Sequence, residues 1–178
     1  GEDIRIWVAG CATGEEAYSL AILFAERLGS AFDQYRLQIF ATDIDADAVN
    51  KARQGLFPLA ISESVSPERL KRFFTKDAQG YRLNKEIREM IVFAPHNLIM
   101  SPPFTKLDIL CCRNLLIYFN AKLQEQLIPL FHYALRPGGF LMLGSSETVG
   151  GFADLFLLQD KKSRIYLKKA THSRPAVT

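Results

Sequence analysis

The feature that most constrains this chain is an apolar segment followed by an amphipathic one, repeated along the sequence. Residues 4–10 form a nearly continuous apolar run that ends at a glycine, which is typical of a strand buried on both faces. Apolar residues at helical spacing follow over 17–28, and the order repeats with a strand over 37–42 and a helix over 46–54. The sequence therefore predicts an α/β fold with a doubly wound, mostly parallel sheet.

Boundary residues agree with this assignment. Thr13 and Glu16 have the spacing of a capping box, in which each side chain satisfies a backbone N–H of the other residue at a helix start. Gly29 is expected to end that first helix. Asp45 is expected to cap the second helix, and Gly55 to stop it.

The alternation breaks over 57–89, where we expect an inserted subdomain made of a helix and a short hairpin. A helix begins near 66–68, a small strand covers 80–84 and a turn lies near 85–86. Residues 90–93 then either return antiparallel or enter the main sheet.

The strand and helix order resumes in the second half of the chain. A strand is predicted over 107–112 and a helix over 121–134, in which Pro129 should cause a kink or end the first part. A turn over 136–139 leads to a further strand over 140–143.

The last predicted element is a hairpin formed by residues 156–158 and 164–167, so the last strand should run antiparallel to its neighbours. We expect one domain over residues 1–170 and a mobile tail over 171–178. The chain begins with Gly1 instead of methionine, which suggests a fragment of a longer protein.

Composition excludes several classes of function. The net charge of +3 is too small for a polybasic nucleic-acid binder, and no apolar run approaches the roughly 18 residues that span a bilayer.

The histidines are too dispersed for a metal site. Adjacent cysteines suit no disulfide framework, so a reducing, cytoplasmic location is expected. These residues are His96, His132, His172, Cys11, Cys111 and Cys112. His132 should be packed, and Cys111 and Cys112 should belong to the core or line the cleft. The lysines at 161–162 and 168–169 should form a solvated hairpin face.

Polar residues gather where the predicted strands end. In an open parallel sheet ligands bind beyond the carboxyl ends of the strands, so these positions predict a binding cleft. The segments concerned are 10–15, 42–45, 96–98, 113–114 and 144–147.

The first two segments indicate the kind of ligand. Gly10 and Gly14 form an incomplete nucleotide-binding fingerprint, which could equally serve only the turn and helix packing. Glu15 at the helix start repels a phosphate and favours a cationic ligand, although it could simply interact with the helix dipole. Asp43 is placed to accept hydrogen bonds from ribose hydroxyls, or else to cap a helix. Together these residues favour S-adenosylmethionine (SAM) over NAD.

Several longer motifs occur in order over nearly the whole chain, namely 10–19, 41–45, 97–98, 112–119 and 135–139. They resemble the chemotaxis receptor glutamate O-methyltransferase family, which has a class I SAM-dependent, Rossmann-like fold. The segments 131–134 and 144–147 look most like the branch that is fused to a methylesterase and sensory modules.

The resemblance implies SAM-dependent methylation of glutamate side chains on chemoreceptor cytoplasmic helices, with S-adenosylhomocysteine as product. Glu15 and Asp43 would hold the amino-acid and ribose parts of SAM, Asn97–Leu98 would border its adenine or ribose, and Arg113–Asn114 would lie beside its methionine end. The implied cofactor-binding residues are Gly10, Thr13, Gly14, Glu15, Asp43, Asn97, Leu98, Arg113 and Asn114.

The resemblance also implies a small β-subdomain at the insertion, where a short segment over 74–81 puts docking of a receptor tail in doubt. The family's N-terminal helical domain has no counterpart before Ile4, so poor catalysis by this chain alone is expected.

Methyl transfer to a glutamate needs no general base, because a carboxylate with an unperturbed pKa of roughly 4.3 is already ionised at pH 7. Arg113 could steer the acceptor carboxylate or be structural, and Tyr118 could line the acceptor pocket or pack above a helix. Two alternatives remain open: a SAM-binding sensory or scaffold module without turnover, and a nucleotide-dependent oxidoreductase.

Overall fold

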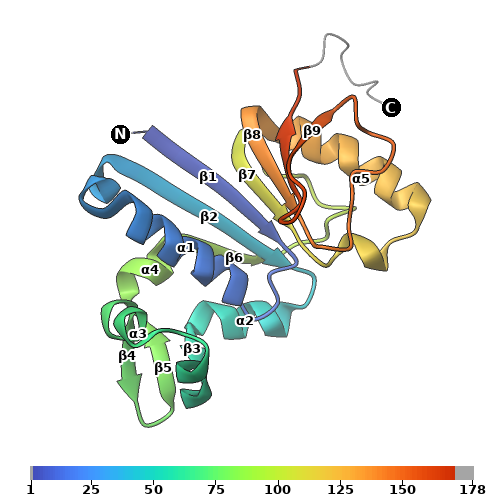
Figure 1. The fold of residues 1–178 in the computed structure, drawn as a ribbon. Helices are drawn as coiled ribbons and strands as arrows, with labels where there is room; N and C mark the ends of the chain where they lie inside the picture. The colour runs from blue at the N-terminus through green and yellow to red at the C-terminus, as the bar shows by residue number, and fades with distance from the viewer. Residues whose placement is uncertain (1, 171–178) are drawn as a thin grey trace. The chain divides into compact units, whose positions relative to one another are not determined.

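The computed structural model describes residues 2–170, and their contacts divide the chain into two compact units. The first contains Cys11–His96 with the first residues of the chain, and the second contains Ile4–Gly10 and the described residues from Asn97 onward. The predicted α/β class is confirmed, with a mostly parallel main sheet of seven strands and a separate three-stranded sheet (Figure 1). The tail predicted over 171–178 lies outside the described residues.

The first unit contains the first two helices of the chain and a pair of parallel strands. Its elements are α1 (Glu15–Leu28), the 3-10 helix η1 (Gly29–Gln34), β2 (Tyr35–Asp43), α2 (Ala46–Gln54) and β6 (Ile91–Pro95). Strands β2 and β6 pair in parallel, with Ala41 opposite Phe93. The segment over 90–93 therefore enters the main sheet and does not return antiparallel.

Three of the four predicted helix boundaries in this unit are confirmed. Gly29 follows α1, Gly55 ends α2 in a left-handed conformation, and the Asp45 carboxylate accepts hydrogen bonds from two backbone N–H groups of the first turn of α2. The capping box predicted for Thr13 is wrong, because Gly14 occupies the N-cap position of α1. The Thr13 hydroxyl instead donates to the Glu15 carboxylate.

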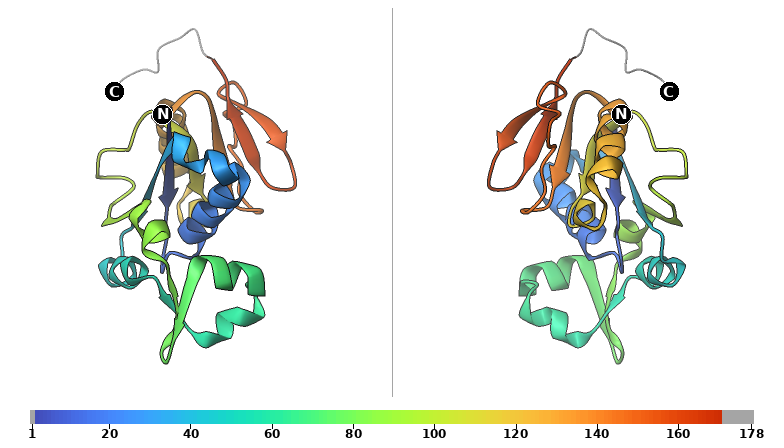
Figure 2. Two further views of the ribbon diagram at one scale, coloured as in Figure 1. Left: turned by 90° about the vertical axis from the view of Figure 1, so that its left-hand side faces the viewer. Right: turned by 90° about the vertical axis from the view of Figure 1, so that its right-hand side faces the viewer.

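The inserted segment forms its own antiparallel sheet, in which β5 (Gly80–Leu83) lies between β3 (Leu56–Phe57) and β4 (Phe74–Asp77). It also contains η2 (Leu59–Glu63) and α3 (Pro67–Phe73), whose N-cap is Ser66 as expected. Figure 2 shows this segment in teal and green. The turn predicted near 85–86 is wrong, because these residues begin a short helix α4 (Lys85–Glu89) that buries Ile87.

The second unit contains five strands in the order β1-β7-β8-β10-β9. They are β1 (Glu2–Ala9), β7 (Leu107–Cys112), β8 (Leu135–Leu143), β9 (Phe156–Asp160) and β10 (Ile165–Lys168), accompanied by η3 (Leu116–Tyr118) and α5 (Ala121–Ala134). Strands β1, β7 and β8 are parallel. Strand β10 runs antiparallel to both β8 and β9, which confirms the predicted direction of the last strand (Figure 2).

In this unit the turn predicted over 136–139 is wrong, and of the two effects predicted for Pro129 the helix end is excluded. The turn expected over 136–139 is an irregularity within β8, since Leu135 pairs with Leu107 and Phe140 already pairs with Ile109. Pro129 does not end α5, which continues to Ala134. Burial of Leu127, Ile128 and Phe131 along this helix offsets the loss of a backbone hydrogen bond at the proline.

Apolar side chains from the strands form the core of the second unit. Trp7 on β1 is fully buried and meets the ring of Phe104 edge-on, with centroids 5.2 Å apart. Cys111 and Cys112 are also fully buried, as expected for core cysteines. Over residues 2–170, no helix has both the length and the apolar character needed to cross a bilayer.

Candidate functional site

Asp43 at the end of β2 organises the loop that follows β1. Its Oδ2 accepts a hydrogen bond of 2.9 Å from the Ala12 backbone N–H, and its Oδ1 accepts one of 2.9 Å from Asp45 N–H. Ala12 has a φ of 49°, a left-handed conformation that is costly for alanine. Asp43 therefore stabilises a strained loop, and the helix-capping role belongs to Asp45 as predicted.

The carboxylates give this loop a negative electrostatic character. Burial, together with the smaller contributions of the Asp43 and Glu15 charges, raises the pKa of the Cys11 thiol to about 12. A thiolate is thus disfavoured at this position. The same carboxylates favour a cationic group nearby, because opposite charges attract and like charges repel.

Packing within the first unit requires a residue without a side chain at Gly14. Its φ is 96°, and an added Cβ would lie 3.0 Å from Ala52 Cβ and 3.3 Å from the Phe93 ring. Conformation and packing account for a glycine here without reference to a ligand, as the more conservative interpretation of the sequence allowed.

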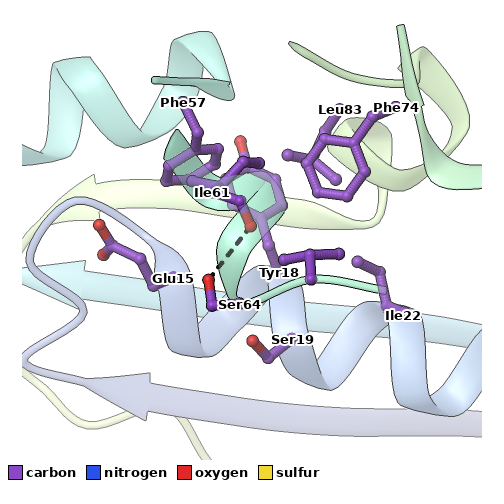
Figure 3. Close-up of a pocket in the computed structure, with 10 residues that line it drawn as sticks. Glu15, Tyr18, Ser19, Ile22, Phe57, Ile61, Ser64, Phe74 and Leu83 are labelled. Carbon is purple, nitrogen blue, oxygen red and sulfur yellow. Dashed lines mark hydrogen bonds between the residues drawn. The ribbon is translucent and has the colours of Figure 1, made fainter. Parts of the chain in front are cut away.

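Glu15 begins α1 and borders a cavity of about 330 Å³ within the first unit. Most of the side chains that line this cavity are apolar, and Figure 3 shows Tyr18 among Phe57, Ile22 and Leu83. Tyr18 is held in place because its hydroxyl donates to the Ala52 carbonyl. Polar groups at the cavity come from Glu15, Ser19 and Ser64, so its lining combines apolar side chains with one carboxylate and two hydroxyls.

In the second unit, the residues after β7 are held by a buried carboxylate. Asn114 has a φ of 60°, and its backbone N–H donates to Glu147 Oε1 over 2.7 Å. Glu147, which is only 3 % exposed, also accepts from Gly144 N–H and Ile117 N–H. Glu147 was not among the predicted site residues. Its position after a buried strand was a signal, but its partners could not be read from the sequence.

The other predicted residues of the second unit lie in loops, except Tyr118, which is the last residue of η3. Asn97 Oδ1 accepts from the backbone N–H groups of Ile99 and Met100, and Leu98 is buried. Arg113 is exposed. Tyr118 is 79 % exposed, which argues against packing above a helix.

The predicted site residues thus fall into two groups, each described in its own unit. The first unit contains Thr13, Gly14, Glu15 and Asp43, and the second contains Gly10, Asn97, Leu98, Arg113, Asn114 and Tyr118. Within the first group, hydrogen bonds join Thr13 to Glu15 and Asp43 to the same loop.

The remaining candidate residues are structural. His132 is buried, and its Nε2 lies 2.8 Å from the Lys169 carbonyl oxygen, as expected for a packed histidine. Lys161 and Lys162 are exposed, as expected for a solvated hairpin face. Lys168 and Lys169 are only half-exposed, and their Nζ atoms donate to the carbonyl oxygens of Leu135 and Ala153. The part of the chain that the structure describes contains no group of three or more potential metal ligands.

Comparison with known proteins identifies the family. Residues 1–165 match the family described as CheR methyltransferase, SAM binding domain. The chain is 44% identical over 166 residues to an uncharacterized 104.1 kDa protein of Rhodobacter capsulatus, covering 93% of this chain and 17% of that protein. It is 35% identical over 175 residues to chemotaxis protein methyltransferase Cher2 of Pseudomonas putida, covering 95% of this chain and 64% of the relative.

A further relative is the chemotaxis protein methyltransferase of Salmonella typhimurium, 34% identical over 166 residues, with 88% of this chain and 56% of that protein covered. The chain thus spans less than two thirds of each of these relatives. A solved structure of a presumed O-methyltransferase from Nostoc punctiforme matches this chain with a TM-score of 0.50 and 14% identity. The match covers 79% of this chain and 32% of the Nostoc chain, and it supports the fold alone. The match to residues 1–165 and the motifs in order show that this chain belongs to the CheR methyltransferase family, within its SAM-binding domain.

Proposed function

We propose that this chain binds S-adenosylmethionine and that the protein methylates glutamate side chains on the cytoplasmic helices of chemoreceptors, as in chemotactic adaptation. Family membership supports the cofactor, and the names of the Pseudomonas and Salmonella relatives support the chemotactic role. Chemoreceptor cytoplasmic domains would be the partners, together with other domains of the same polypeptide. The proposed location is therefore the cytoplasm.

The observation that carries the proposal is the acidic loop between β1 and α1. SAM bears a sulfonium and an α-ammonium group, and a loop whose carboxylates already raise the pKa of Cys11 suits such a cation. Each Asp43 oxygen accepts one backbone N–H and retains a lone pair for a ribose hydroxyl. A pyrophosphate at the same helix start would be repelled by Glu15, which disfavours NAD.

The proposed division of roles follows the family resemblance and the chemistry of each side chain. Glu15 would hold the ammonium group and Asp43 the ribose. Asn97–Leu98 would border the adenine or ribose, and Arg113–Asn114 the methionine end. Gly10, Thr13 and Gly14 would shape the loop without contributing charge.

When bound, SAM supplies an electrophilic methyl group, so that the C–O bond to the acceptor forms as the C–S bond breaks and its electron pair stays on sulfur. The protein residues have to align the acceptor carboxylate and exclude water, which is catalysis by positioning. Arg113 is exposed and lies outside any strand, so its guanidinium can orient an anionic acceptor. Tyr118, largely exposed, would line the acceptor side.

Calorimetry with S-adenosylhomocysteine and with NAD tests the cofactor. We expect binding of the first only, and a loss of about tenfold in affinity for Glu15→Gln, because a hydrogen bond to a charged group contributes about 1.5–3 kcal/mol. Glu16→Gln is a matched control, since it removes an adjacent charge from the same helix turn. Binding of NAD alone, or equal losses in the two variants, would contradict the proposed cofactor site.

Methyl transfer to purified chemoreceptor separates an enzyme from a binding module. We expect turnover by the longest available form of the protein and much weaker turnover by residues 1–178. Cofactor binding without transfer by either form would indicate a sensory or scaffold module. Equal turnover by the two forms would refute the expected need for an additional helical domain.

A further inference from the structure

Glu147 is a buried carboxylate that serves the backbone of the second unit. It is 3 % exposed, and its two oxygens accept three backbone N–H groups. Oε1 accepts from Asn114 over 2.7 Å and from Gly144 over 2.8 Å, and Oε2 accepts from Ile117 over 3.1 Å. A buried carboxylate with this many donors is strongly held, since charge-assisted hydrogen bonds are about twice as strong as neutral ones.

Two of the three donors belong to one turn of chain after β7. Asn114 and Ile117 lie at the two ends of that turn, and Asn114 adopts a left-handed backbone with a φ of 60°. Two of the three bonds made by Glu147 therefore fix the conformation of the segment that contains Arg113 and Asn114. Their sequence separations of 33 and 30 residues make this a tertiary restraint.

Gly144 is an independent sign that the chain is closely packed around the Glu147 carboxylate, because only glycine fits at this position. An added Cβ would lie 2.4 Å from Asn114 Oδ1, 2.7 Å from Glu147 Oε1 and 2.8 Å from Asn114 N. Contacts under 3.0 Å would force the carboxylate or the Asn114 backbone to move. Gly144 and Glu147 therefore act together on the same segment.

We propose that Glu147, with the space left by Gly144, is the positioning residue that sets the Arg113–Asn114 segment for binding of the cofactor. This inference rests on the proposed function, which places the methionine end of SAM beside that segment. Glu147 itself does not contact the cofactor in this proposal. It acts through the backbone N–H groups of Asn114 and Ile117.

The variants Glu147→Gln, Glu147→Ala and Gly144→Ala test the proposal in the full chain. A glutamine retains one oxygen for Asn114 and Gly144 but turns an NH₂ donor toward the Ile117 N–H, so one of the three bonds is lost. Asp108→Asn is the matched control. Asp108 lies on β7, toward the end away from Arg113–Asn114, and its carboxylate accepts a hydrogen bond of 2.9 Å from the backbone N–H of Arg5.

The measurements are the affinity for S-adenosylhomocysteine by calorimetry and the thermal unfolding midpoint of each variant. We expect about tenfold weaker binding for Glu147→Gln and for Gly144→Ala, and a larger loss for Glu147→Ala. Asp108→Asn should lower the midpoint and leave the affinity unchanged. If Glu147→Ala does not fold, the other two variants decide the question.

Wild-type affinity in Glu147→Gln and Gly144→Ala would overturn the inference while leaving the proposed function intact. The inference would also be overturned if affinity fell in proportion to the unfolding midpoint in all variants, Asp108→Asn included. A wild-type chain that binds no S-adenosylhomocysteine would instead refute the proposed function at the first step.

Discussion

At the scale of single residues, His132 shows how burial sets the charge of a side chain. It lies on α5, its ring meets that of Phe156 edge-on, and burial lowers its pKa. Since Lys169 O can only accept, Nε2 carries the proton of the neutral ring. A protonated imidazole would be disfavoured in this environment.

We therefore predict that His132 makes the folded state less stable in acid. The unfolded chain binds the proton more strongly, so stability is lost as pH falls below the unfolded value of about 6.5. Above that value both states are neutral at this residue, and the effect disappears. Urea unfolding at a series of pH values should give a smaller loss between about pH 7 and 5 for His132→Gln than for the wild type. Parallel curves for the two proteins would contradict this assignment.

Individual residues also show what the sequence could reveal. The capping role of Asp45 was predicted correctly, because a helix start is a local feature, whereas the ribose-binding role of Asp43 stays a prediction. Glu147 was missed because its bonds reach back 33 and 30 residues, and no periodicity reports such contacts. The capping box at Thr13 failed because the glycine after it adopts a left-handed conformation and takes the N-cap position.

At the scale of elements, buried apolar residues determine how far α5 and β8 extend, which the local proline and glycine signals alone did not predict. Helix α5 passes through Pro129, and β8 accommodates the residues 136–139 without ending. In both cases several buried apolar residues continue the element beyond the unfavourable position. The segment 136–139 therefore predicted correctly where the backbone of β8 is irregular, but neither this segment nor Pro129 predicted where an element ends.

Replacement of Pro129 tests this explanation. We expect Pro129→Ala to stabilise the protein by about 1–3 kcal/mol, because alanine restores a backbone donor inside the helix and relieves a steric clash. The gain should appear as a higher urea midpoint at an unchanged slope. Lys122→Ala, an exposed position in the first turn of the same helix, is the control and should change little. A loss of stability in Pro129→Ala would show that the proline ring contributes more by packing than it costs.

At the scale of the whole molecule, the chain order predicted the fold well. Strands and helices recur in the expected sequence, and the last strand reverses as its hairpin signal indicated. The inserted segment was less well predicted, because its strands are short and their pairing is antiparallel and non-sequential. The site roles stay predictions, since they depend on a ligand that the sequence implies only through resemblance and charge.

Cysteine labelling should report on each compact unit separately. Cys11 belongs to the first unit, and Cys111 and Cys112 belong to the second. All three are at most 4 % exposed, and burial raises the pKa of Cys11 to about 12. We expect slow reaction with iodoacetamide at pH 7 in the native protein and complete reaction in denaturant, which mass spectrometry of the peptides can measure.

Rapid native labelling of Cys11 alone would show that the first unit opens on its own. Labelling of all three thiols at the denatured rate would contradict the burial described for both units.

The single tryptophan gives the second unit an optical signal of its own. Trp7 is completely enclosed against Phe104, so its fluorescence emission should lie at short wavelength and shift to the red when β1 is released into water. The first unit contains no such fluorophore among its residues 11–96. A denaturation curve followed by tryptophan fluorescence will therefore report the unfolding of the second unit and will not report that of the first.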